Sequence, residues 1–118
     1  MRDFKTLQVW QKSHQLTLAV YAAAAAFPQS ELYGLTSQVR RACASIPANI
    51  AEGAGRNGDT EFAHFCSIAM GSASELEYHL LLAHDLGFLP DADYVCIQAD
   101  FVEVRRMLNT FMQRLRTG

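Results

Sequence analysis

The stretch Gly34–Arg56, GLTSQVRRACASIPANIAEGAGR, decides the fold. Its apolar residues recur at helical spacing and predict a helix over residues 35–56, yet Pro47 lies in the interior of that helix. An interior proline costs about 3 kcal/mol because it lacks an N–H and its ring clashes with the preceding turn. The surroundings must therefore hold this helix in place, and we expect it to bend at Pro47.

Three faces separate on this helix when residues are placed about 100° apart. We expect the apolar face to point into the protein; it consists of Val39, Cys43, Ile46 and Ile50. A strip of small residues would let another helix approach closely; it consists of Ala44, Ala48, Ala51 and Gly55. The polar strip consists of Gln38, Ser45, Asn49, Glu52 and Arg56, and Arg41 borders it.

The polar strip has two interpretations, which the sequence leaves open. Glu52 and Arg56 are spaced i,i+4 in the favourable order, which is typical of a solvated face. Ser45 and Asn49 are poor choices for a helix interior, and they favour a buried or interfacial hydrogen-bonding network. Glu75 on the next helix is a candidate partner for Arg41 or Arg56 in such a network. A ligand site on the strip is the weaker alternative.

The remaining sequence also predicts helices. Glycine and proline interrupt the chain near residues 28, 55–58 and 87–90, so we expect helices at about 5–27, 35–56, 59–86 and 91–115. The last of these carries one continuous apolar seam: Tyr94, Ile97, Phe101, Val104, Leu108, Phe111 and Leu115. Gly71, inside the third helix, suggests that another backbone passes close to it. The sequence thus predicts a single all-α domain over residues 1–118, an up-down-up-down four-helix bundle whose second helix is kinked at Pro47.

The first helix carries two apolar stripes on opposite sides. One consists of Leu7, Trp10, His14, Leu18, Tyr21 and Ala25, and the other of Val9, Leu16, Val20, Ala23 and Phe27. A helix on the surface of a monomeric bundle needs only one apolar face. We therefore expect a homo-oligomer in which the large residues of the second stripe, Val9, Leu16, Val20 and Phe27, form the subunit interface. The alternative is that the alanines simply raise helix propensity.

Charge, cysteine content and the distribution of apolar residues indicate the general class of protein. The 118 residues carry a formal net charge of −2, so bulk charge does not indicate nucleic-acid binding, although arginines cluster near the C-terminal end. The three cysteines, widely spaced and without a CxxC pair, are typical of reduced thiols in a cytoplasmic protein. We expect no secretory signal and no membrane segment, since the apolar run at Ala22–Ala26 is too short to span a bilayer.

No motif points to catalysis, a metal or a cofactor. Glu61 and His64 form an E-x-x-H motif, but a di-iron bundle needs a second such helix, and the fourth helix contains no histidine. The spacing Gly53-x-Gly55-x-x-Gly58 follows a helix rather than a strand, so the context of a dinucleotide site is missing. We therefore expect no catalytic residue, no metal ligand and no cofactor.

Several segments together resemble a known family. The pattern in Asp3–Lys12, in Phe27–Thr36, and through the central motif Gln38–Arg56 is similar to the bacterial four-helix-bundle family named after the 23S rRNA intervening-sequence protein. The similarity continues to Glu77 and fades after Leu89. The resemblance implies an up-down bundle that assembles into a ring-like homopentamer. It extends to the accessory variability determinant of diversity-generating retroelements, a relative that works with a reverse transcriptase and binds nucleic acid.

Two functional hypotheses follow. The first is a non-enzymatic, homo-oligomeric binding or scaffold protein of the cytoplasm, a pentamer by resemblance, with itself as its main partner and no membrane partner. The second is RNA or DNA binding by the assembled ring, because symmetry repeats each arginine and can build basic belts despite the negative net charge. The candidate contacts are Arg40, Arg41, Arg105, Arg106, Arg114 and Arg116.

Overall fold

The computed structural model describes residues 2–117 and is all-α, with no strand in that part of the chain. Two short 3₁₀ helices, η1 (Phe4–Thr6) and η2 (Gln29–Glu31), accompany the long helices. The long helices are α1 (Gln8–Ala24), α2 (Leu35–Ala54), α3 (Asp59–Asp85) and α4 (Asp91–Thr117). The fold class predicted from the sequence is confirmed, and the boundaries of the helices lie within a few residues of those expected.

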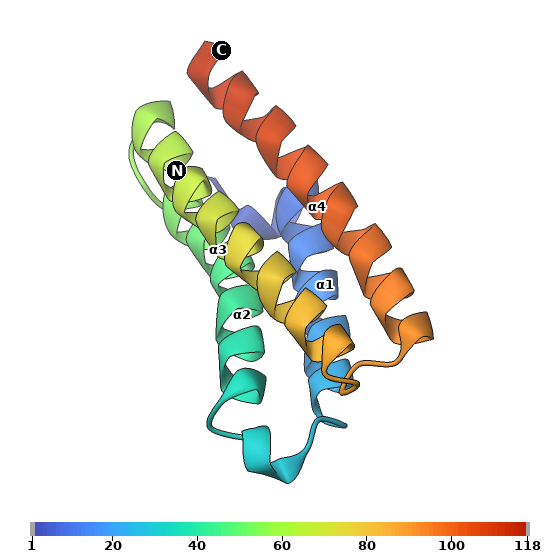
Figure 1. Cartoon of the computed structure of the whole chain (residues 1–118). Coiled ribbons are helices and arrows are strands. Elements are labelled where there is room, and N and C mark those ends of the chain that lie inside the picture. Colours follow the sequence, from blue (N-terminus) through green and yellow to red (C-terminus); the bar gives the residue numbers. More distant parts are fainter. Residues whose placement is uncertain (1, 118) are drawn as a thin grey trace.

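The four long helices form an up-down bundle (Figure 1). Short connections make consecutive helices antiparallel, and each helix packs against two others: α1 against α2 and α4, and α3 against α2 and α4. The bundle measures 44 × 24 × 20 Å. Every long helix therefore has an inner face and an outer face, and the outer faces are the surfaces available for function.

The core follows the predicted helical seams. The apolar face of α2 is buried as expected, with Val39, Cys43, Ile46 and Ile50 fully covered. Most of the α4 seam is buried too, and two of its residues, Tyr94 and Phe111, are half-buried. Phe111 packs edge-on against Phe62 of α3, with ring centroids 5.1 Å apart. Burial of these apolar side chains is the main favourable contribution to the fold.

Pro47 lies inside α2, which continues as a helix on both sides of it. Because Pro47 has no N–H, the carbonyl of Cys43 loses its intrahelical partner. The hydroxyl oxygen of Thr17 on α1 lies 3.4 Å from that carbonyl and also bonds the Ser13 carbonyl at 2.8 Å. Packing against α1 thus supplies a polar neighbour at the freed position. The bend at Pro47 stays a prediction.

The predicted subunit interface on α1 is wrong. Val9, Leu16, Val20 and Phe27 are only 4%, 0%, 1% and 8% exposed, and they form the core of the protomer itself. The opposite stripe faces outward, with Leu18 59% and Tyr21 41% exposed. Helical periodicity shows that two apolar stripes exist, but it does not say which one faces the protomer's own core.

The close approach of a neighbouring helix also lies at a different glycine than expected. A Cβ on Gly71 would meet no atom of a neighbouring element within 4 Å in the described part of the chain. A Cβ on Gly53 would lie 2.7 Å from Cδ1 of Phe62 and 2.9 Å from Cβ of Phe65. Gly53 in α2 is therefore the residue whose missing side chain admits α3.

Candidate functional site

The inner part of the polar strip on α2 is a hydrogen-bonded cluster. The hydroxyls of Ser45 and Ser72 lie 2.7 Å apart and connect α2 to α3. The amide of Asn49 donates to the Ser45 carbonyl at 2.8 Å and to the Ser45 hydroxyl at 2.9 Å. All three side chains are half-buried, so their polar atoms gain partners in place of water. Ser72 was not predicted; its signal in the sequence is its place among the small residues around Gly71.

The outer part of the strip is solvated. Glu52 and Arg56 form an exposed i,i+4 ion pair at 2.6 Å, and the Arg56 guanidinium lies 4.9 Å from the centre of the Phe65 ring. Gln38, Arg41 and Glu75 are exposed, and within residues 2–117 no hydrogen bond or ion pair joins them to the strip. The structure thus brings Ser45 and Asn49 together with Ser72 but does not bring Glu75 to Arg41 or Arg56. The interpretation as a hydrogen-bonding network therefore describes Ser45 and Asn49, and the interpretation as a solvated face describes the outer part of the strip.

The candidate arginines occupy different places. Arg105 forms an ion pair with Glu77 of α3 at 3.1 Å. Arg40 reaches the Tyr21 carbonyl at 3.4 Å, near the end of α1, and its guanidinium lies 5.1 Å from the centre of the Tyr21 ring. Arg40 therefore helps to fix the end of α1 against α2. Arg41, its neighbour on α2, is exposed.

Arg106 and Arg114 line one cleft of about 430 Å³ between the start of α1 and the second half of α4. Thr6, Gln8 and Thr110 also line it, as does Glu103, whose carboxylate lies 3.8 Å from Arg106. Arg116 lines a separate recess beside Asp59, Thr60 and His64. On one protomer the six arginines therefore do not form one belt, and the cleft holds two of them.

Burial makes two of the three thiols poor nucleophiles. It raises the pKa of Cys43 to about 11, despite a hydrogen bond with Thr17 that lowers it. It also raises the pKa of Cys66 to about 11, against an opposing charge effect of Arg116. Cys96 is exposed. Among the described residues, no group of three or more histidine, cysteine or acidic side chains is placed to hold a metal ion.

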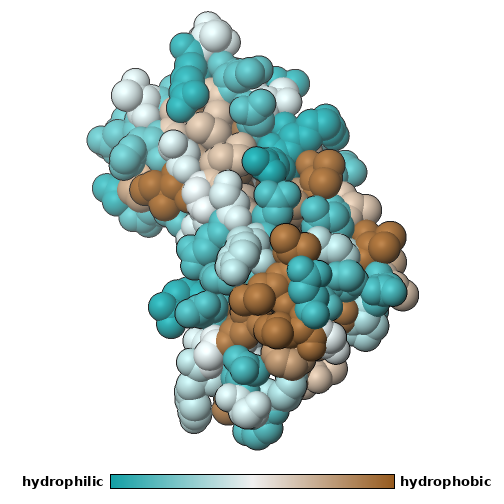
Figure 2. All heavy atoms as spheres, in the orientation of Figure 1, coloured by the Kyte–Doolittle hydropathy of each residue, from teal (hydrophilic) through white to brown (hydrophobic). Residues whose placement is uncertain are grey.

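Apolar side chains are exposed on the outer faces of α1, α3 and α4; those on α3 are Ile68, Tyr78 and Leu81. On α1 the face contains Leu18 and Tyr21, together with His14 and the half-buried Trp10, whose rings stack 4.9 Å apart. On α4 a shallow surface consists of Tyr94, Val95, Gln98, Ala99 and Val102, and Val95 and Val102 are 66% and 55% exposed. Hydrophobic surface gathers over the C-terminal half of α3 and recurs along α4 (Figure 2).

The α4 face was not predicted, although its signal is present. Val95, Ala99 and Val102 are spaced i, i+4 and i+7, which places them on one side of the helix. That side is opposite the core seam of Ile97, Phe101 and Val104. The oxygen Oε1 of Gln98, at the edge of this face, is buried and has no hydrogen-bond partner among residues 2–117. Within residues 2–117, none of the helices has both the length and the apolar character needed to cross a membrane.

Comparisons with known proteins identify the family but no activity. No curated protein matches the chain. A crystal structure at 1.70 Å resolution of a protein of unknown function from the S23 ribosomal protein family of Bacteroides thetaiotaomicron has a similar fold, with a TM-score of 0.82 and 24% sequence identity. The similarity covers 89% of this chain and 95% of that one. The family model described as 23S rRNA-intervening sequence protein matches residues 5–110. The match covers most of the sequence, including all of the central motif, and the chain therefore belongs to the 23S rRNA-intervening sequence protein family.

Proposed function

We propose that this protein is a non-enzymatic binding or scaffold protein of the cytoplasm that acts as a homo-oligomer. One observation carries the proposal: α1 and α4 each present an apolar outer face opposite the face that they bury in their own core. Exposed apolar surface that recurs at helical spacing is typical of an interaction site. Because the chain has such a face on both α1 and α4, a second copy offers an apolar surface against which each face can pack.

Two different faces favour a ring. A contact between the α1 face of one copy and the α4 face of the next is heterologous, and heterologous contacts close into rings when the rotation permits. The family resemblance in the central motif favours five subunits.

Light scattering on the purified chain tests the assembly. We expect the wild type to be larger than one subunit at micromolar concentration. Leu18→Asp and Val95→Asp should each reduce the mass without loss of helicity, whereas Gln15→Asp, on an exposed polar position of α1, should not. A wild-type monomer contradicts the proposal, and unchanged mass in both variants excludes these faces.

Mixing the two variants tests which face meets which. Leu18→Asp keeps its α4 face and Val95→Asp keeps its α1 face, so a heterologous contact predicts a one-to-one complex in the mixture. An isologous contact between two α1 faces instead leaves Val95→Asp self-associated when it is alone. A mixture that shows only single subunits contradicts the heterologous arrangement.

Nucleic-acid binding is the second candidate, and the cleft that holds Arg106 and Arg114 favours it. Phosphate contacts by arginine release counterions, so affinity for RNA or DNA should fall steeply with salt. Arg106→Gln with Arg114→Gln should reduce both the affinity and the salt dependence. Arg105→Gln is the control, since Arg105 is occupied by Glu77. No binding at low salt, or an equal loss in the control, contradicts this candidate.

A further inference from the structure

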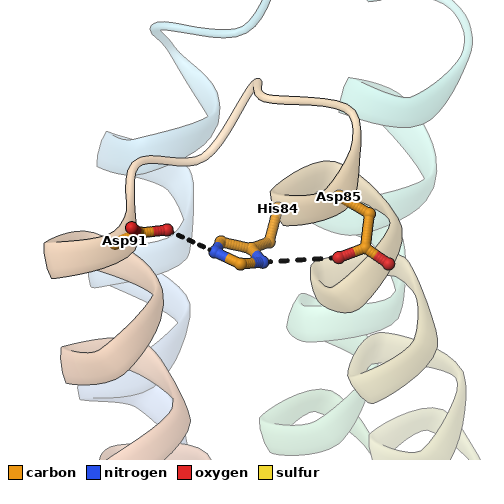
Figure 3. A network of polar contacts seen from close by, with 3 residues as sticks. All are labelled: His84, Asp85 and Asp91. Atoms are coloured by element: carbon orange, nitrogen blue, oxygen red, sulfur yellow. Dashed lines mark hydrogen bonds and ion pairs between the residues drawn. The ribbon is translucent and has the colours of Figure 1, made fainter.

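The corner between α3 and α4 holds a histidine between two carboxylates that come from the two helices. His84 lies in the last turn of α3, and its Nε2 is 2.6 Å from Oδ1 of Asp91, the first residue of α4. Its Nδ1 is 3.5 Å from Oδ1 of Asp85 (Figure 3). The ring also stacks on Tyr94 of α4, with centroids 4.4 Å apart and an angle of 17° between the planes.

Backbone hydrogen bonds fix the turn at the end of α3 without any contribution from the His84 side chain. Gly87 has a φ of +81°, and its N–H donates to the His84 carbonyl at 3.0 Å. The N–H of Phe88 donates to the Ala83 carbonyl at 2.9 Å, which completes a Schellman motif at the end of α3. Phe88 then packs on Phe27 near the end of α1. The side chain of His84 is thus presented to Asp91 from a fixed position.

The geometry favours the imidazolium form. A neutral imidazole has one N–H and one lone pair, so it can donate to only one of the two carboxylates, whereas the imidazolium donates from both nitrogens. A positive charge also suits the C-terminal end of α3, and the negative charge of Asp91 suits the start of α4. The Tyr94 ring face attracts the same cation.

The charged groups around His84 all favour its protonated form. Asp85 on α3 and Asp91 on α4 face it, and both stabilise a positive charge. The connecting residues, Leu86–Pro90, contain no ionisable side chain. Asp93, two residues after Asp91 on α4, lines a separate recess with alanines of α1.

We propose that His84 is a pH-sensitive clasp, whose imidazolium joins Asp91 to the end of α3 and holds the first turns of α4 in place, and whose deprotonation loosens them. The hydrogen bond with Asp91 is the main cause that raises the pKa of His84, and partial burial opposes it. Because the pKa is raised in the folded state, the stabilisation is complete below the ordinary value of about 6.5 and is lost as pH rises through the folded value.

The clasp is coupled to the outer face of α4 through Tyr94. Tyr94 stacks on His84 and also lines the apolar surface with Val95, Gln98 and Val102. Loosening of the first turns of α4 therefore alters the apolar surface that a partner would meet. The protonation state of His84, a local change at the corner, therefore alters this apolar surface of α4.

The wild-type chain allows a direct test. Titration of the imidazole signals by NMR should give His84 a midpoint above the ordinary value of about 6.5. Asp91→Asn should lower the His84 midpoint and leave the signals of His64, an exposed histidine of α3, unaffected. A His84 midpoint at or below the ordinary value overturns the proposal, and so does an unchanged midpoint in Asp91→Asn.

Hydrogen exchange tests the release itself. Protection factors of the amides in the first turns of α4 should fall in the wild type as pH rises through the His84 midpoint. In His84→Gln these amides should be weakly protected at every pH, while His64→Gln should behave as wild type. A wild-type pH profile in His84→Gln overturns the proposal.

Discussion

The hydroxyl oxygens of Ser45 and Ser72 lie 2.7 Å apart and join α2 to α3 one half-turn before Pro47. Asn49 donates to the Ser45 hydroxyl from the other side of the proline. These bonds bracket the position at which the helix lacks its own hydrogen bond. Side chains on two helices therefore hold α2 where its backbone is weakest.

Ser72→Ala should destabilise the protein by about 1 kcal/mol, because it removes a half-buried hydrogen bond and leaves Ser45 with one partner fewer. Urea unfolding followed by circular dichroism measures the change. Ser74→Ala, two residues along α3 and exposed, is the control and should change stability by less. Equal effects of the two substitutions would show that the bond contributes nothing.

Gly53→Ala and Gly71→Ala should change stability in opposite directions. Both gain about 1 kcal/mol of helix propensity. At Gly53 the new Cβ would lie within 2.7 Å of Phe62 and 2.9 Å of Phe65, and such overpacking costs about 1–3 kcal/mol, so a net loss is expected. At Gly71 the space is open and the gain should be realised. Thermal unfolding of the pair checks this, and a stabilised Gly53→Ala would contradict the observed packing.

Thiol labelling should distinguish Cys96 from the two buried cysteines. Cys43 and Cys66 are buried with pKa values of about 11, so few thiolates form near neutral pH, whereas Cys96 is exposed. A thiol reagent at about pH 8 should modify one cysteine per chain rapidly in the native state and all three in denaturant. Cys96→Ser should abolish the rapid phase. A rapid phase that persists in this variant contradicts the burial of the other two.

Helical periodicity was sufficient to predict the fold. The seam from Ile97 to Leu108 and the inner face of α2 follow from residues spaced three and four apart, since each helix of a bundle must pack one apolar stripe against its neighbours. Periodicity did not determine which of the two apolar stripes on α1 is buried in the core. Both have helical spacing, and only packing against α2 and α4 selects Leu16 and Val20 for the core.

The polar contacts were predicted less completely than the core. Ser45 and Asn49 stood out because they are unusual in a helix interior, but the partner, Ser72, depends on the register between α2 and α3. The His84 corner was missed for a similar reason. His84 and Asp91 are seven residues apart across a turn, and they meet because Gly87 reverses the chain.

Val20→Asp should unfold the protein rather than dissociate an assembly. Val20 is 1% exposed inside the protomer, and burial of an unpaired carboxylate there costs several kcal/mol, comparable with the whole stability of a small domain. Leu18→Asp, two residues away and 59% exposed, places the same charge in solvent and should keep its helical signal. Circular dichroism and light scattering on both variants separate the two effects. If Val20→Asp stays folded but its mass is reduced, the Val20 stripe lies between subunits instead. If Val20→Asp loses helicity and Leu18→Asp does not, the Val20 stripe lies in the core. The Leu18 stripe is then the one left for contacts between copies.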